Sequence, residues 1–157
     1  MSQHPLIIIL EDIRSALNVG AIFRTADGAG ASQLFLVGIT PYPPHNRIPK
    51  TALGAIDYVT WQHFTSISEA INNLPAGYEI VGAELTTEAV VYTEHTFTHP
   101  TALIMGNEIS GLSAAAQKSC HALVKIPMYG RKESLNVATS CGIISYEIIR
   151  QFNLATE

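Results

Sequence analysis

The chain has 157 residues, a length typical of one domain with a single substantial core. Apolar residues make up 47% of it and charged residues 14%, which excludes a disordered chain. The net charge of −4 argues against a broad nucleic-acid surface, and the longest apolar run, residues 6–10, is too short to span a membrane.

The ends of the chain and its cysteines indicate a cytoplasmic protein. The N-terminus lacks a charged region followed by a long apolar one, so no signal peptide is predicted. Cys120 and Cys141 are far apart in the sequence, and we expect buried free thiols in a reducing compartment rather than a disulfide. Because the composition is so apolar, we also expect an oligomer that covers part of the surface.

The first quarter of the chain predicts a strand, a helix and a second strand. Residues 6–10 are continuously apolar, as in a strand covered on both faces. Asn18 is expected to cap a helix over residues 19–26, which glycine C-cap chemistry ends at residues 27–30. Residues 33–37 predict the next strand, and the short connections indicate a parallel crossover.

A proline-rich loop follows at residues 38–50. Its four prolines exclude a helix or a central strand, and a loop this long in a small domain is more often functional than idle. The pattern then predicts a helical turn at 51–55, a strand at 58–61, a helix at 66–73 that begins with a capping box of Ser66 and Glu69, and a strand at 78–83.

The second half of the chain ends in a long amphipathic helix. Before it we expect a short edge strand or extended loop at 89–92, a buried strand at 101–105, a short helix from its cap Ser113 to about Ser119, and a strand at 122–126. The closing helix follows a polar loop, with Ser134 as its N-cap. Five or six parallel strands alternating with helices predict an α/β fold, with a single parallel sheet flanked by helices.

Several common ligand motifs are incomplete. Gly28 and Gly30 suggest a dinucleotide fingerprint, but Gln33 replaces its third glycine and the run ends a helix instead of opening one. No phosphate-binding loop is present. His95 and His99 are followed by Pro100, which argues against a helix that would present both to a metal, so no metal site is expected.

Three other segments place polar groups directly after predicted strands, where open α/β sheets bind ligands. The first is Asn-Val-Gly-Ala-Ile-Phe-Arg-Thr at 18–25. The second is Ile-Met-Gly-Asn-Glu-Ile-Ser-Gly-Leu at 104–112. The third combines Ile-Pro-Met at 126–128 with Ser-Leu-Asn-Val at 134–137.

In this order and spacing, the three motifs resemble those of the SpoU (TrmH-type) RNA ribose methyltransferases of the SPOUT superfamily, and residues 50–55 add to the resemblance. The resemblance implies a deep C-terminal trefoil knot, a homodimer and S-adenosylmethionine bound by the loops of the knot. It implies methyl transfer to a ribose 2′-hydroxyl of tRNA or rRNA, with S-adenosylhomocysteine as product. We expect one methyltransferase domain over residues 1–157 without a separate RNA-binding extension, so an accessory protein is one source of substrate recognition.

The resemblance assigns cofactor contacts to Gly106, Ile126, Met128 and Leu135. This assignment agrees with the chemistry of the ligand, since an adenine needs apolar walls and a few backbone groups, and a glycine lets backbone approach closely. The alternative for each residue is ordinary packing in a core or turn.

The resemblance assigns the polar catalytic cluster to Asn18, Arg24, Glu108, Ser134 and Asn136. A guanidinium hardly loses its proton, so we expect Arg24 to clamp the target phosphate and lower the pKa of the hydroxyl, not to act as a base. Helix capping is the alternative for the asparagines and the serine, and Glu108 is expected to be structural. The candidate RNA contacts are Arg14, Arg47, Lys50, Arg131 and Lys132.

Three other functions stay open at this point. A related knotted enzyme would methylate a base nitrogen. A cofactor-binding RNA module would have little catalysis, although Arg24 and Asn136 are both present. A flavodoxin-like or dehydrogenase domain is disfavoured by the absent phosphate loop.

Overall fold

The computed structural model describes residues 3–156. Its seven strands form one sheet with the order β3-β2-β1-β6-β4-β7-β5, and every neighbouring pair is parallel. The predicted parallel α/β sheet is confirmed, with seven strands in place of five or six. The strands are β1 (His4–Glu11), β2 (Ala31–Val37), β3 (Trp61–Phe64), β4 (Glu79–Ala83), β5 (Val90–Val91), β6 (Thr101–Met105) and β7 (Ala122–Lys125).

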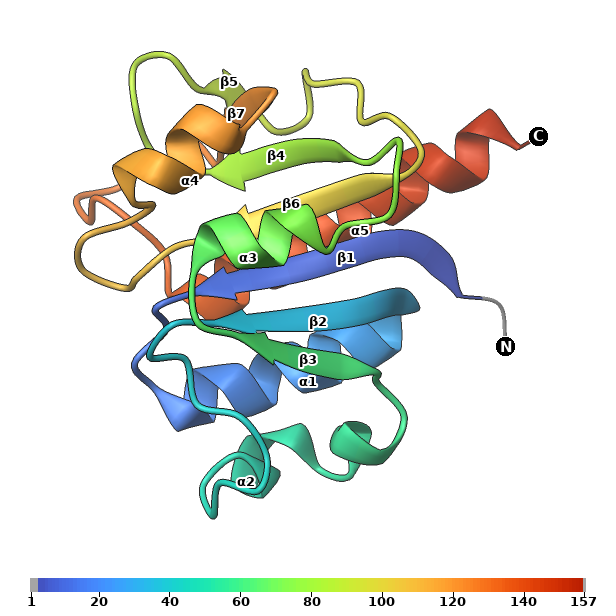
Figure 1. Cartoon of the computed structure of the whole chain (residues 1–157). Coiled ribbons are helices and arrows are strands. Elements are labelled where there is room, and N and C mark those ends of the chain that lie inside the picture. Colours follow the sequence, from blue (N-terminus) through green and yellow to red (C-terminus); the bar gives the residue numbers. More distant parts are fainter. Residues whose placement is uncertain (1–2, 157) are drawn as a thin grey trace.

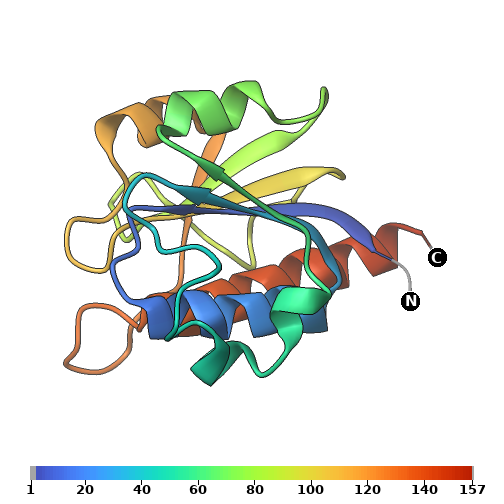
Figure 2. The same cartoon turned by 60° about the horizontal axis from the view of Figure 1, so that its bottom comes forward.

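Helices cover both faces of this sheet (Figures 1 and 2). The long helices α1 (Ala16–Ala29) and α5 (Val137–Ala155) pack side by side on one face, while the short helices α3 (Ile67–Asn72) and α4 (Ala114–Ser119) lie on the other. Two smaller elements, α2 (Pro49–Ala52) and the 3-10 turn η1 (Ala55–Asp57), pack beside α1.

Strand β1 separates two hydrophobic clusters, as its continuous apolar run predicts. Leu6, Ile8 and Leu10 belong to the cluster under α1 and α5, whereas Ile7 and Ile9 belong to the one under α3 and α4. All five side chains are completely buried. Alternation along the strand therefore anchors both layers of helices to the centre of the sheet.

Both long helices begin at residues other than those expected. Ser15 caps α1, and its hydroxyl accepts from the backbone N–H of Asn18 at 3.2 Å, so the prediction of Asn18 as cap is wrong. Asn136, not Ser134, caps α5, since its Oδ1 accepts from the N–H groups of Ala138 and Thr139. As a result, the side chains of Asn18 and Ser134 are available for other contacts.

The predicted strand at 58–61 is also wrong, because β3 begins only at Trp61. The backbone N–H of Val59 donates to the carbonyl of Ala55 at 3.1 Å, and both side chains are buried. This closed turn removes residues 58 and 59 from the sheet, although their β-branched and aromatic character is typical of a strand.

The two short helices have the predicted serine caps. Ser66 accepts from the N–H of Glu69, and Ser113 does the same for α4. The carboxylate of Glu69 reaches the N–H of Thr65 at 2.9 Å and not that of Ser66, so the capping box is displaced by one residue.

Several further details bear on the sequence analysis, and one of them differs, since Cys120 is only partly buried. Gly30 ends α1 in the left-handed region with φ of 70°. Both cysteines are free, and burial raises the pKa of the Cys141 thiol to about 12. Within residues 3–156, no helix is both long and apolar enough to cross a bilayer. The trefoil knot stays a prediction from the resemblance.

Strand order places a topological switch next to β1. From β1 the chain runs outward through β2 and β3, then crosses to β4 on the other side of β1. In open α/β sheets, ligands bind beyond the carboxyl ends of the strands at such a switch. The loops after β4, β6 and β7 lie at this end of the sheet (Figure 1).

Candidate active site

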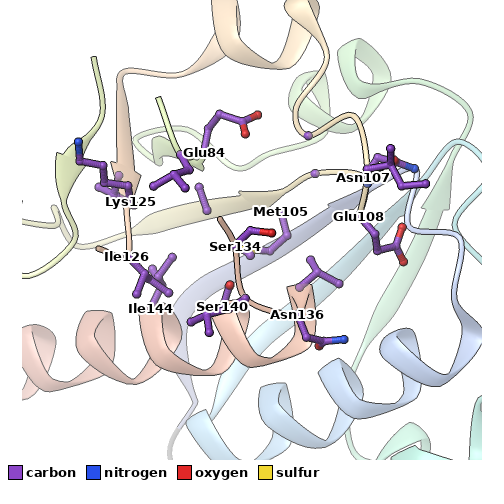
Figure 3. Close-up of a pocket in the computed structure, with 18 of the residues that line it drawn as sticks. Glu84, Met105, Asn107, Glu108, Lys125, Ile126, Ser134, Asn136, Ser140 and Ile144 are labelled. Carbon is purple, nitrogen blue, oxygen red and sulfur yellow. Dashed lines mark hydrogen bonds between the residues drawn. The ribbon is translucent and has the colours of Figure 1, made fainter. Parts of the chain in front are cut away.

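A cavity of roughly 290 Å³ lies at the carboxyl ends of β4, β6 and β7, against the first turns of α5 (Figure 3). This volume is at the lower end of the range for small-molecule sites. The cavity is lined by residues 83–85, 105–111, 124–126, 128, 134–137, 140 and 144. It therefore unites the second and third sequence motifs.

One part of the wall is apolar. Met105 and Ile144 are buried at its base, while Ile126, Met128 and Leu135 come from the end of β7 and the loop before α5. Leu135 is 38% exposed and lines the cavity. A flat apolar group is the kind of ligand that such a wall can cover.

The backbone of the loop after β6 leaves no room for a side chain at position 106. A Cβ there would lie 2.5 Å from the carbonyl carbon of Gly111 and 2.5 Å from the nitrogen of Leu112. The loop returns so closely because Asn107 and Gly111 exchange two backbone hydrogen bonds, and the Leu112 N–H donates to Glu84 Oε2 at 2.7 Å. The close approach at Gly106 is to the protein's own loop, which is the turn-packing alternative, and the cofactor contact assigned to Gly106 stays a prediction. This loop forms one side of the cavity.

Glu108 connects the loop after β6 to the start of α1. Its Oε2 accepts from the N–H of Arg14 at 3.0 Å, and its Oε1 accepts from the N–H of Ser15 at 3.2 Å. Asn18 Nδ2 adds a third contact to Oε1 at 3.4 Å. Desolvation raises the pKa of Glu108, but hydrogen bonds from backbone N–H groups and from Asn18 outweigh it, so the pKa lies below its usual value. Glu108 is thus a fixed carboxylate that holds two motifs together.

The two asparagines complete a chain of contacts between all three motifs. Asn136 Nδ2 donates to Asn18 Oδ1 at 3.1 Å, and Asn18 in turn donates to Glu108. Figure 3 shows Asn136 and Glu108 at the same end of the cavity. Asn136 therefore has two functions, since its Oδ1 caps α5 while its amide nitrogen orders Asn18.

The structure brings most of the predicted site together. Seven of the residues assigned to cofactor or catalysis line the cavity: Gly106, Glu108, Ile126, Met128, Ser134, Leu135 and Asn136. Asn18 joins them through its hydrogen bonds. Arg24 does not, because it is exposed on α1, two turns beyond Asn18. It lines neither this cavity nor a second cavity that lies beside it at the start of α1.

The candidate RNA contacts divide into two groups. Arg14 and Arg47 line a second cavity beside the first. Lys50, Arg131 and Lys132 are exposed and line neither. The predicted basic residues therefore do not form one common wall.

Sequence reasoning assigned no role to five polar residues of the cavity: Glu84, Asn107, Ser110, Lys125 and Ser140. Glu84 follows β4 directly and Lys125 ends β7, so the rule that ligands lie beyond strand ends would have pointed to both. Asn107 shapes the loop, since its Oδ1 accepts from the N–H groups of Ile109 and Ser110 and its Nδ2 donates to the Asp12 carbonyl at 2.7 Å. Ser140 gave no signal apart from its place one turn into α5.

Known proteins match nearly the whole chain in sequence and in structure. The 23S rRNA (guanosine-2′-O-)-methyltransferase RlmB of Haemophilus influenzae is 32% identical over 151 residues, 95% of this chain and 61% of the relative. An AdoMet-bound rRNA methyltransferase structure from Sinorhizobium meliloti matches with TM-score 0.86 and 33% identity, over 94% of this chain and 58% of that one. A structure described as giving insight into 2-OH methylation of C/U34 on tRNA matches with TM-score 0.86 and 25% identity, over 96% of this chain and 97% of that one.

The matches to curated relatives cover nearly all of this chain but only part of each relative. The protein spans about three fifths of the length of the curated relatives it matches first, which are covered to 61–63%. The sequence model of the SpoU rRNA Methylase family matches residues 5–146, and these include all three motifs up to the first half of α5. The protein therefore belongs to the SpoU rRNA methylase family.

Proposed function

We propose that this protein transfers a methyl group from S-adenosylmethionine to a ribose 2′-hydroxyl of RNA. The observation that carries the proposal is the hydrogen-bonded chain Asn136–Asn18–Glu108 at the end of the cavity, because it assembles polar groups from three distant motifs beside an apolar wall. Family membership and the activity of the RlmB relative support the same reaction.

The cavity residues fit the proposed cofactor. Ile126, Met128 and Leu135 would cover the adenine, and the polar groups of Glu84 and Ser134 would bind ribose or the methionine end. When bound, the cofactor supplies a methyl group on a sulfonium. The AdoMet-bound structure of the rRNA methyltransferase from Sinorhizobium meliloti supports this assignment.

The protein's own residues position the acceptor. Methyl transfer is an in-line displacement, so its rate depends on how well the ribose oxygen is aligned with the sulfonium methyl. Asn18 and Asn136 are held in place by their mutual hydrogen bond and would orient the 2′-hydroxyl. As its oxygen gains the methyl group, the S–CH3 bond would break to leave S-adenosylhomocysteine, and the hydroxyl proton would pass to solvent water. Glu108 is a poor candidate for the base, because both of its oxygens already accept hydrogen bonds.

In a homodimer, the cavity of one chain could receive Arg24 of the partner subunit. Arg24 is exposed and lines neither the candidate active site nor the second cavity beside it, yet it matches the catalytic arginine of the family motif. We infer that the partner's Arg24 reaches the cavity and clamps the phosphate of the target nucleotide.

Mixing inactive variants tests the shared site. Arg24→Ala and Asn136→Ala would be inactive alone, but their mixed dimer would contain one site without either substitution. Co-expression with random pairing should restore roughly a quarter of wild-type activity, since about half of the dimers are mixed and each has one intact site. No recovery in purified mixed dimers would show that each chain uses its own Arg24.

The relatives point to two classes of RNA as the substrate. RlmB acts on guanosine of 23S rRNA, and the structure matched over 97% of its length concerns C/U34 of tRNA. Incubating the protein with methyl-labelled S-adenosylmethionine and separated tRNA and rRNA from cells lacking the gene would distinguish them. Label in neither fraction, with cofactor binding intact, would favour the binding module or a requirement for an accessory protein.

A further inference from the structure

A second cavity of about 580 Å³ adjoins the candidate active site. It lies between the start of α1 and the proline-rich loop, and Glu108 and Ile109 belong to the walls of both cavities. The second cavity is lined by residues 14–18, 45, 47, 108 and 109. A ligand there would lie directly beside whatever occupies the first cavity.

The free polar groups of this second cavity are predominantly donors. Within residues 3–156, the guanidinium groups of Arg14 and Arg47 have neither an ion pair nor a side-chain hydrogen bond, because the two ion pairs found there involve other residues. Glu108 is the one acid in the wall, and its oxygens are already occupied by N–H groups. His45 Nδ1 accepts from the N–H of Arg47 at 3.2 Å, which places the proton of a neutral ring on Nε2.

Close packing fixes one end of the loop that carries His45 and Arg47. Ile48 is completely buried, and Thr51 Oγ1 donates to the Leu17 carbonyl at 2.7 Å. Gly20 of α1 makes this approach available, since a Cβ there would lie 2.1 Å from Thr51 Oγ1 and 2.3 Å from the Ile48 carbonyl oxygen. Arg47 therefore directly precedes a residue, Ile48, that is packed tightly against α1.

Aromatic rings fix the other end of the loop. The ring of Tyr42 lies 4.1 Å from that of His63 and 6.1 Å from that of Trp61, measured between centroids, and both partners belong to β3. His63 Nε2 is in turn 3.1 Å from the Gly38 carbonyl. With both ends held, the loop places Arg47 in the same cavity as Arg14 before any RNA binds, which reduces the backbone ordering that binding requires.

We propose that this second cavity binds the phosphodiester linkage of RNA next to the methylated ribose, with Arg14 and Arg47 holding one phosphate. The inference rests on the proposed function for the identity of the neighbouring group. A phosphate is the ligand that two unpaired guanidinium groups recognise best, and every ribose in RNA is joined to one. The proline-rich loop is then the element that sets the register of the RNA in the active site.

Salt-dependent RNA binding tests this inference without any need for catalysis. The probe is fluorescently labelled bulk tRNA, measured by anisotropy with S-adenosylhomocysteine present, for the wild type, Arg14→Ala, Arg47→Ala and the double variant. Lys118→Ala is the matched control, because Lys118 is an exposed cation on α4, at the opposite face of the sheet.

Each arginine variant should weaken binding about tenfold at moderate salt, as expected for loss of a hydrogen bond to a charged group. Because one phosphate contact is lost, the double variant should also reduce the slope of log affinity against log salt by about 0.7 to 0.9. Lys118→Ala should match the wild type. Equal affinities and slopes for all five proteins, or no binding of tRNA by the wild type, would overturn the inference.

Methyl transfer and cofactor binding separate this inference from the proposed function. All variants should bind S-adenosylmethionine like the wild type, because neither arginine lines the first cavity. If the protein methylates RNA but the arginine variants bind RNA as tightly as the wild type, the proposed reaction is supported and the phosphate site is contradicted. Loss of RNA binding in a protein that methylates no RNA would support the phosphate site and contradict the reaction.

Discussion

Asn136 Nδ2 lies 3.1 Å from Asn18 Oδ1, although 118 positions separate the two residues in the chain. Asn136 is the N-cap of α5 and Asn18 lies in the first turn of α1, so the contact joins the N-terminal ends of the two long helices. Both ends face the candidate active site. A single pair of amides therefore couples helix capping to the geometry of the proposed acceptor site.

Substitution of Asn136 separates these two functions. Asn136→Asp keeps an oxygen that caps α5 but loses the amide that donates to Asn18, so stability should change by no more than about 0.5 kcal/mol while methyl transfer falls at least about tenfold. Asn136→Ala loses both and should also cost about 1 kcal/mol of stability. Thermal unfolding and initial rates provide the comparison, and full activity in Asn136→Asp would contradict the positioning role.

Glu108 should make stability depend on pH on the acid side. Its pKa in the folded protein lies below the usual value of 4.5, so its stabilising effect is complete above that value and is lost as the pH falls through the folded pKa. Urea unfolding should show Glu108→Gln less stable than the wild type at pH 7, with a difference that narrows as the pH falls below 4.5. A constant difference over this range would mean that the carboxylate contributes nothing through its charge.

Gly106→Ala should displace the loop at 107–112. The added methyl group would overlap backbone atoms of Gly111 and Leu112, which cannot rotate away, so a loss of roughly 1–3 kcal/mol of stability is expected together with weaker S-adenosylmethionine binding. Gly130→Ala is the control, because a Cβ there meets no atom within 4 Å. Calorimetric titration of both variants checks the pair, and equal cofactor affinities would exclude this role of Gly106.

Arg24→Lys tests the proposed clamp. Lysine keeps the charge but lacks the planar pair of donors that matches a phosphate, so most of the methyl-transfer activity should be lost. The fold should be unaffected, since Arg24 is exposed and surface substitutions usually change stability by less than about 0.5 kcal/mol. Wild-type turnover of Arg24→Lys would rule out a bidentate clamp.

Much of the fold was predictable because its signals are local. The apolar run of β1, the glycine that ends α1 and the serine caps of α3 and α4 each act within a few residues. The errors occurred where two local signals competed for the same few residues. The turn from Ala55 to Val59 overrode a strand-like composition, and at both long helices one polar residue took the cap that a neighbour offered equally well.

The candidate site was predictable where it follows a motif. Glu108, Ser134 and Asn136 line one cavity, as the resemblance implies. Glu84 and Lys125 were not predicted, because they belong to no motif and reach the cavity only through the position of β4 and β7 in the sheet. The loop of His45 and Arg47 was expected to be functional, but its attachment through Gly20 and Tyr42 depends on tertiary packing that spacing alone does not reveal.

The central claim is that the methyl group is placed on ribose, and alkaline hydrolysis of the labelled RNA tests it most directly. Alkali cleaves RNA through the free 2′-hydroxyl, so a 2′-O-methylated residue stays joined to its neighbour. After incubation with methyl-labelled S-adenosylmethionine, we predict that the label is recovered in alkali-stable dinucleotides and that the Asn136→Asp and Arg24→Lys variants incorporate far less of it. Label released entirely as mononucleotides would place the methyl group on a base and contradict the account.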